Sequence, residues 1–341
     1  MRKLIALFTA AVLGACAHAD AARQVFPRSS PLARGELTFR LDSNGAQHPV
    51  YRAHAGQTCP AAEPGDLRQR LVDLAVQEWA RFNYPRSRRA DEDELRRIFP
   101  DLPRAYAEDP YTERDPIMLQ AIGGYWAVLR GVGSGRIADT GRHEINTANA
   151  LWRRAAREYR ASPGWSTPWS AAFVSWVMCE AGVDGFARSW AHRDYVDAAI
   201  AASDDRVRHP YRAYEADRIP LIGDLLCSSR DEYGPKQLAD RRDNPDDEAM
   251  MHCDLVVAID APSGLILAIG GNVDNAVSLI PYRIVATEEG VRVRSVCRDE
   301  PVCSDERLFA VLALDAPASE ASLAEAPNLF ARPLQPPPRM R

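Results

Sequence analysis

A change of pattern about halfway along the chain constrains the fold most. Up to residue 182, apolar residues recur at three- and four-residue steps, which is typical of one face of a helix. Beyond that point, short segments rich in Val, Ile and Leu are separated by Gly, Pro and Asp, which is typical of strands and turns. The predicted strands are 221–228, 253–259, 265–269, 277–284, 291–296 and 308–314. Helices followed by closely spaced strands predict an α+β fold with an antiparallel sheet.

The helical half contains one segment that should be fully buried. It begins Thr167-Pro168-Trp169-Ser170 and is apolar on most of its surface. Thr167 suits the N-cap, Pro168 suits the first helical position, and Gly182 suits the residue after the C-cap. Other helices are expected at 65–83, near 92–98 and at 143–161, and a further apolar stretch covers 117–129.

The first residues predict export. Arg2-Lys3 precede an apolar run that is too short to span a bilayer, as in a signal peptide over residues 1–15. The run ends at Cys16 in a Leu-Gly-Ala-Cys sequence that resembles a bacterial lipobox, which implies cleavage before Cys16 and lipid on its thiol. The alternative is ordinary cleavage after Ala19. We expect an outer-membrane-anchored lipoprotein facing the periplasm or, with ordinary cleavage, a soluble periplasmic protein.

Composition shifts predict the further organisation of the chain. Residues 16–60 are rich in Ala, Arg, Ser, Pro and Gly and are expected to form a tether that holds at most one short strand at 37–41. Residues 61–162 form a helical N-terminal part of the domain, and residues 163–315 form its α+β core. Residues 316–341 are rich in Ala and Pro, so we expect a disordered tail.

The cysteines and charges exclude several classes of protein. No Cys-x-x-Cys pair and no His-rich cluster occurs, so neither a metal nor a cofactor is expected. The net charge of −5 does not favour binding to nucleic acid. An exported chain can form disulfides. Cys227 ends one predicted strand and Cys253 begins the next, so we expect these two to be bonded; Cys297 and Cys303 bracket a short turn that a disulfide could close.

Three segments together predict a catalytic site. Ser170 lies in the first turn of the buried helix, where the helix dipole favours negative charge. His252 and Asn272 are equally distant from residue 262, the centre of the turn 260–264, so they should face each other across a hairpin. An asparagine there could orient the imidazole of His252 as a base for Ser170.

These segments resemble those of a known superfamily. The helix start Pro168-Trp169-Ser170, the Gly223-Asp224 strand, the strand with His252 and the Gly270-Gly271-Asn272 segment look like those of CHAP amidases, and their order is the same. CHAP amidases are papain-like peptidoglycan hydrolases related to the NlpC-type peptidases. The likeness covers about 163–284. Because Ser170 stands where those enzymes have their nucleophilic cysteine, the chain looks most like DUF2272, an uncharacterised branch, over about 65–315.

The resemblance implies a papain-like fold in which the buried helix packs on the sheet. It implies a hydrolase site with catalytic residues Ser170, His252 and Asn272, and substrate-binding positions Trp169, His192, Asp224 and Gly271. Some relatives carry an acidic orienting residue where this chain has Gly270.

Three functions stay open at this point. The first is a peptidoglycan amidase or peptidase anchored by its lipid. The second is an inactive pseudo-hydrolase that binds the cell wall or a cell-envelope protein. The third is a serine esterase or acyltransferase, for which a serine nucleophile is better suited.

Overall fold

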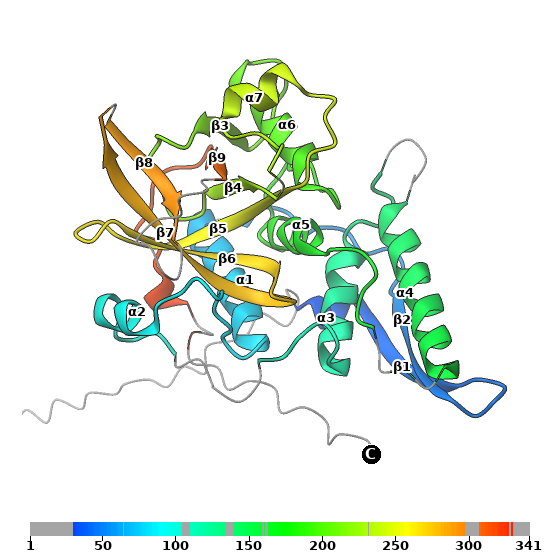
Figure 1. Cartoon of the computed structure of the whole chain (residues 1–341). Helices are drawn as coiled ribbons and strands as arrows, with labels where there is room; N and C mark the ends of the chain where they lie inside the picture. The colour runs from blue at the N-terminus through cyan, green and yellow to red at the C-terminus, as the bar shows by residue number, and fades with distance from the viewer. Residues whose placement is uncertain are drawn as a thin grey trace, which may run out of the picture.

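The computed structural model describes residues 30–63, 65–103, 110–133, 139–158, 160, 163–230, 232–288, 290–296, 307–326 and 329. Their main feature is a seven-stranded antiparallel sheet in the order β3-β9-β4-β5-β6-β7-β8, with helices packed on one face (Figure 1). The predicted α+β fold with an antiparallel sheet is therefore confirmed.

All six predicted strands are present, and β3 is an additional edge strand. Their bounds are β3 Tyr211–Glu215, β4 Leu225–Ser229, β5 Met251–Asp260, β6 Leu265–Val273, β7 Ala276–Thr287, β8 Gly290–Ser295 and β9 Leu308–Leu314.

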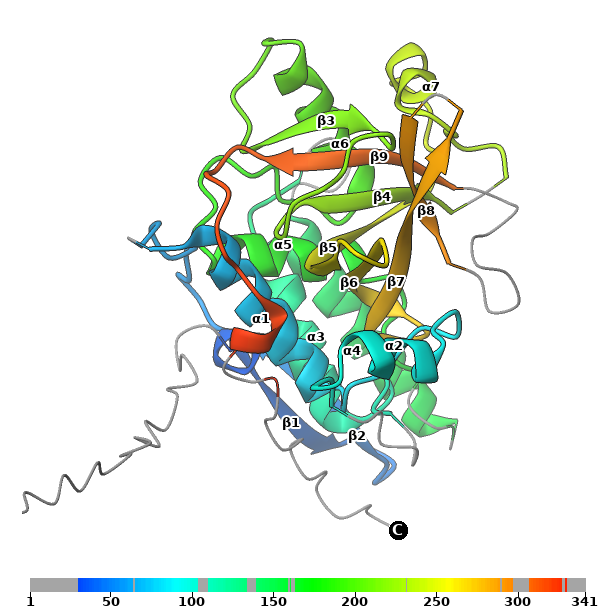
Figure 2. The same cartoon turned by 90° about the vertical axis from the view of Figure 1, so that its left-hand side faces the viewer.

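The sheet is strongly curled. In Figure 2, β7 and β8 run steeply across the direction of β3, β9 and β4. Val293 in β8 donates its backbone N–H to the carbonyl of Ala216, just after β3, at 2.8 Å. The curl therefore brings the two edges of the sheet together and gives it an inner and an outer face.

The two faces bury separate cores, because side chains alternate along each strand. On β5, Leu255 and Val257 face outward into the helices, whereas Val256 faces inward to pack with Ala268 and Tyr282. Up to Val257, odd-numbered residues of β5 thus support the helices and even-numbered residues line the inside of the curl; the register shift between Val256 and Ala258 reverses this order beyond it.

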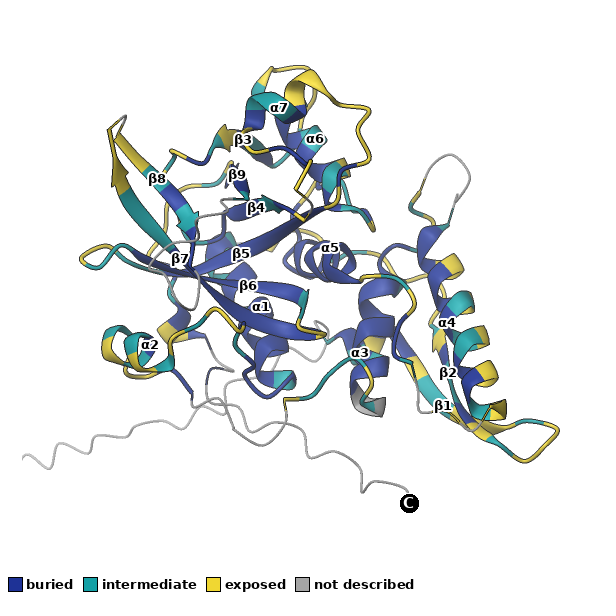
Figure 3. Cartoon of the chain, viewed as in Figure 1, coloured by how far each residue is buried: buried dark blue, intermediate teal, exposed yellow. Residues whose placement is uncertain are grey.

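The helices that cover the outer face include α1, α5 and α6, of which α5 is completely buried (Figure 3). The helices and 3-10 turns are η1 Pro31–Arg34, α1 Leu67–Arg81, α2 Glu92–Ile98, α3 Pro116–Ala127, α4 Thr140–Arg157, α5 Ser170–Glu180, α6 His192–Ser203, α7 Leu238–Asp243 and η2 Leu323–Glu325.

Helix α5 begins two residues later than the cap pattern predicted. Trp169 is its N-cap, so Ser170, and not Pro168, is the first helical residue. Thr167 makes no cap. At the other end Gly182 follows the C-cap in the left-handed conformation, φ 72°, as predicted.

The expected tether is in part a folded element. Strands β1, Gly35–Leu41, and β2, Gln47–Ala53, pair as a hairpin that packs on α3 and α4. Tyr51 of β2 is fully buried, and a Cβ atom on Gly123 of α3 would lie only 2.6 Å from its ring. This close packing, which composition cannot reveal, corrects the prediction for residues 30–60.

The expected disordered tail also begins as ordered chain. Its 3-10 turn η2 packs on α1, with Leu323 and Ala326 buried. Ser322 receives a hydrogen bond at its carbonyl from the Gln69 side chain and donates its N–H back to that side chain. The Ala-rich composition thus supplies small apolar side chains that fit against a helix.

Two disulfides join described cysteines. Cys227 and Cys253 lie directly opposite each other in β4 and β5 and are bonded, as predicted. Cys59 and Cys179 form a second disulfide, which was not predicted. Cys16, Cys297 and Cys303 lie outside the described residues. Disulfides indicate an oxidising, extracytoplasmic compartment.

No helix in the described ranges has the length and apolar character needed to cross a membrane.

The two disulfides should differ in their effect on stability. Cys59–Cys179 spans 120 residues and Cys227–Cys253 spans 26. In the loop-entropy description, replacing the first pair by serine should lower the free energy of unfolding by about 5 kcal/mol, against about 3.5 kcal/mol for the second. Urea unfolding of the two double variants checks this; a larger loss for Cys227→Ser/Cys253→Ser would contradict it.

Candidate functional site

Three side chains meet beside the first residues of β5. Ser170 is the first residue of α5, His192 the first residue of α6, and His252 the second residue of β5. Ser170 Oγ lies 2.7 Å from His192 Nε2, and the two imidazole rings are 5.1 Å apart at their centroids. Each of the three residues is at most 6 % exposed. The structure thus pairs Ser170 with His192, whereas the sequence predicted a pair with His252.

The position of His192 depends on an irregularity in β6. Leu255 faces Ile269, in the register that the hairpin predicted, but regular pairing of β5 with β6 begins only there. The N–H of Val256 bonds to Asp224 on the β4 side, so by alternation the N–H of Cys253 points toward the β6 side. It donates to His192 Nδ1 at 3.1 Å. The imidazole therefore satisfies a strand N–H that β6 leaves unpaired.

The groups around Nδ1 favour one tautomer of His192. The hydroxyl of Tyr195 also contacts Nδ1 and can donate or accept, whereas the backbone N–H of Cys253 can only donate. In the tautomer that satisfies this N–H, Nδ1 accepts and the proton sits on Nε2. Nε2 then donates to Ser170 Oγ. Burial lowers the pKa of His192 well below its ordinary value, and the neighbouring His252 and Arg230 lower it further. His192 is thus a neutral hydrogen-bond donor to Ser170 and has no free nitrogen to accept its proton.

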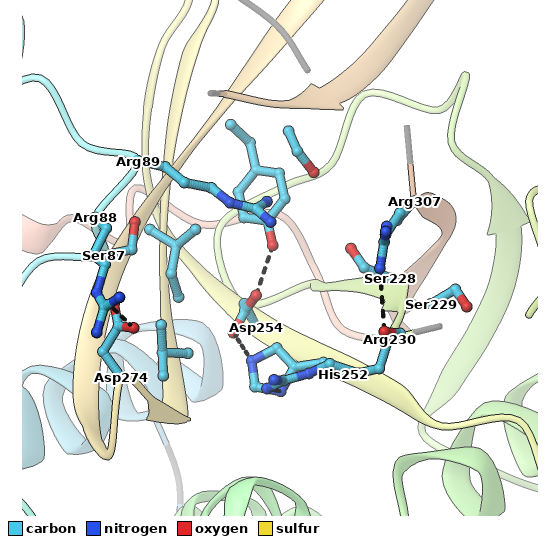
Figure 4. A pocket seen from close by; sticks show the side chains of 14 residues that line it. Ser87, Arg88, Arg89, Ser228, Ser229, Arg230, His252, Asp254, Asp274 and Arg307 are labelled. Atoms are coloured by element: carbon cyan, nitrogen blue, oxygen red, sulfur yellow. Dashed lines mark hydrogen bonds and ion pairs between the residues drawn. The ribbon is translucent and has the colours of Figure 1, made fainter. Parts of the chain in front are cut away.

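Both ring nitrogens of His252 face a neighbouring group, one through a hydrogen bond and one at ion-pair distance (Figure 4). Arg230 Nη2 donates to Nδ1 at 2.9 Å, and Nε2 lies 2.7 Å from Asp254 Oδ1. Burial alone would raise the pKa of Asp254, but His252, the hydroxyl of Tyr282 at 2.6 Å and the charge of Arg230 together lower it. The carboxylate is therefore ionised and takes the orienting role that was expected of Asn272.

The part of the chain that the structure describes shows no hydrogen bond between Asn272 and His252. The β6–β7 register shifts between Gly270 and Val273, and Asn272 adopts a left-handed conformation, φ 56°, within this irregular segment. The hairpin arithmetic assumed a regular strand and so failed at this point. Asn272 therefore has no place in the hydrogen bonds that hold His252.

Gly270 leaves room for the carboxylate of Asp254, which takes the place of the acidic group that some relatives carry at position 270. It occupies the position where some relatives carry an acidic residue, and a Cβ atom there would lie 1.8 Å from Asp254 Oδ1. The carboxylate thus fills the space beside Gly270 from the neighbouring strand. The sequence held a signal for this, because His252 and Asp254 are two residues apart on a strand and so share one face.

The other predicted substrate-binding residues support the scaffold. Trp169 is fully buried and donates from Nε1 to Glu113 at 2.8 Å. Asp224 forms a buried ion pair with Arg68 at 2.9 Å. Gly271 packs on Phe173 of α5, since a Cβ atom there would lie 2.6 Å from that side chain.

The accessible part of the site is a pocket of about 330 Å³ at the same end of the sheet, inside the curl. His252 and Asp254 form part of its lining, and Arg88 and Arg89 face Arg230 and Arg307 across them (Figure 4). The remaining lining residues are Ser87, Ser228, Ser229, Val273, Asp274, Ile280, Tyr282 and Ser295. Sequence analysis missed these arginines, because they come from separate loops and strand ends.

The structure describes no group of His, Cys, Asp and Glu side chains that could hold a metal ion within the ranges given above.

Comparison with known proteins gives one match. The model of a family described as "Uncharacterized protein conserved in bacteria (DUF2272)" matches residues 113–314, which is more than half of the chain. The matched region contains Ser170, His192, Arg230 and His252, whereas Arg89 precedes it. No curated protein and no solved structure matches the chain.

The neutral, buried state of His192 predicts a dependence of stability on pH. Above the unfolded-state pKa of about 6.5, this imidazole is neutral in both the folded and the unfolded chain. Below that pH, the unfolded chain binds a proton at this imidazole and the folded chain does not. Between about pH 6.5 and 5, the free energy of unfolding should therefore fall more steeply for wild type than for His192→Gln, by up to about 1.4 kcal/mol per pH unit.

Urea titrations across this pH range measure the slope. His143→Gln, at an exposed position of α4, is the matched control and should keep the wild-type slope. Equal slopes for wild type and His192→Gln would show that the buried imidazole is not held neutral.

The fit of Asp254 against Gly270 predicts strong coupling between the two positions. Gly270→Ala should lower the free energy of unfolding by about 3 kcal/mol, because the new methyl group displaces a buried, paired carboxylate. In an Asp254→Ala background the same change should cost at least about 1 kcal/mol less. A double-mutant cycle of urea unfolding measures this coupling, and additive effects would refute the packing described.

Proposed function

We propose that this chain, which belongs to the DUF2272 family, is an exported cell-envelope lipoprotein that uses a papain-like scaffold to bind peptidoglycan without cleaving it. The observation that carries the proposal is that every ring nitrogen of the two imidazoles near Ser170 already faces another group of the protein. Nδ1 of His192 is occupied by a backbone donor and its Nε2 donates to Ser170, while His252 is held by Arg230 and Asp254.

A serine hydroxyl needs a base at the moment of attack, because it does not ionise near neutral pH. His192 cannot supply this base through Nε2, which already carries the proton. Ser170 is also 6 % exposed and does not line the pocket. Both observations favour the pseudo-hydrolase over a serine enzyme.

The papain-like scaffold is supported by the arrangement of the site elements. Ser170 begins a buried helix that packs on an antiparallel sheet, and His252 lies on the strand that α5 contacts. Peptidoglycan as the ligand rests on the sequence resemblance. Export is supported by the signal-like first residues and by the two disulfides, and anchoring by the lipobox-like sequence at Cys16.

A serine hydrolase or acyltransferase is the second candidate. Ser170 Oγ lies 2.7 Å from His192 Nε2 at the N-terminus of α5, where backbone N–H groups stabilise an oxyanion. For catalysis, His192 would have to release the N–H of Cys253 and carry its proton on Nδ1 instead. Nε2 could then accept the proton of Ser170 while the serine attacks a carbonyl carbon.

Purified peptidoglycan sacculi separate the two candidates. The mature chain should sediment with sacculi, release no soluble fragments and remain unlabelled by a fluorophosphonate. Ser170→Ala should bind sacculi as wild type does, because its side chain does not reach the pocket. Fragment release or labelling that Ser170→Ala abolishes would establish the serine enzyme, and failure of wild type to sediment with sacculi would refute peptidoglycan binding.

A further inference from the structure

The pocket inside the curl carries an excess of positive charge. Four arginines line it, Arg88, Arg89, Arg230 and Arg307, against two carboxylates, Asp254 and Asp274. This excess is local, because the whole chain is acidic with a net charge of −5. A positive pocket on a negative protein favours an anionic ligand at this position.

The carboxylates do not compensate the charge of the whole pocket. Asp274 pairs with Arg88 at 3.3 Å on the outer rim, where the Arg88 side chain is 86 % exposed. Asp254 is 2 % exposed, and its two oxygens lie against His252 and Tyr282. Both carboxylates are therefore already engaged by side chains of the protein.

The side chains of Arg89 and Ser87, both in the lining of the pocket, are without partners of their own in the described part of the chain. The described residues offer Arg89 no hydrogen bond or ion pair, yet its charge lies close enough to lower the pKa of buried Tyr282 against the larger opposing effect of burial. Ser87 is 6 % exposed, and its hydroxyl has no hydrogen-bond partner in the described part of the chain. Since buried hydroxyls are normally bonded, Ser87 Oγ is available to a ligand in the pocket.

Arg230 extends the same arrangement on the opposite side. One of its guanidinium nitrogens donates to His252 Nδ1, which holds the planar group at the pocket wall. Planar guanidinium groups recognise oxyanions through paired N–H donors. With Arg89 facing it and Ser87 on the same loop as Arg89, the pocket presents donors from two sides.

We propose that this pocket binds a carboxylate of the ligand, with Arg89 and Arg230 as the charged donors and Ser87 as a neutral donor. The identity of the ligand as a cell-wall peptide rests on the proposed function; the preference for an oxyanion rests on the pocket itself. His252 and Asp254 serve as positioning residues that hold Arg230.

The test uses the mature chain and a dipeptide with an N-terminal fluorophore and a free C-terminal carboxylate. Fluorescence anisotropy should show binding that weakens about tenfold or more when the C-terminus is amidated, or when Arg89 is replaced in Arg89→Gln. Arg153→Gln, at an exposed position of α4, is the matched control and should bind the acid as wild type does. Thermal unfolding of Arg89→Gln verifies that the variant is folded.

Sacculi whose carboxylates have been converted to amides separate this inference from the proposed function. Reduced sedimentation with amidated sacculi supports the carboxylate site. Equal sedimentation with native and amidated sacculi overturns it and leaves peptidoglycan binding intact. Arg89-dependent binding of the dipeptide acid without sedimentation on any sacculi upholds the site and refutes peptidoglycan as the ligand. Arg89-dependent binding of inorganic phosphate without binding of the dipeptide acid overturns the assignment to carboxylate.

Discussion

The hydrogen bond from the backbone of Cys253 to His192 sets the chemistry of this site. A buried backbone N–H is normally hydrogen-bonded. Cys253 of β5 has no pairing partner in β6, and its N–H donates instead to Nδ1 of His192. That bond influences which nitrogen of His192 carries the proton, and hence whether Ser170 faces a donor or a base. The way β5 pairs with β6 therefore influences the reactivity of Ser170 more than the identity of the Ser170 and His192 side chains does.

The same strand separates scaffold from ligand pocket. Cys253, Leu255 and Val257 support the helices, with Cys253 bonded to Cys227, while His252 and Asp254 face into the curl. The residues of β5 that support the fold are therefore different from those that line the pocket. The buried pair of Arg68 and Asp224 belongs to the scaffold side, where Arg68 also donates to the carbonyl of Leu314 and so ties α1 to β4 and β9.

Sequence reasoning succeeded where local rules decide the structure. Periodicity predicted the strands, the left-handed Gly182 marked the end of α5, and strand order predicted the bond between Cys227 and Cys253. It failed where distant contacts decide. The hairpin at 35–53 is held by packing on α3, and the irregular turn of β6 removed Asn272 from the site. The role of Asp254 in place of an acidic residue at position 270 could have been predicted from the sequence, because His252 and Asp254 form a His-x-Asp pattern on a strand.

The connectivity of the two disulfides has a consequence for biogenesis. Each joins a cysteine to the next one along the chain, Cys59 to Cys179 and Cys227 to Cys253. A polypeptide that emerges N-terminus first into an oxidising compartment would form both bonds by oxidising thiols in order of arrival, with no reshuffling. Cys16 precedes Cys59. The lipid proposed for Cys16 would therefore also remove a thiol that could compete with Cys59 for its partner.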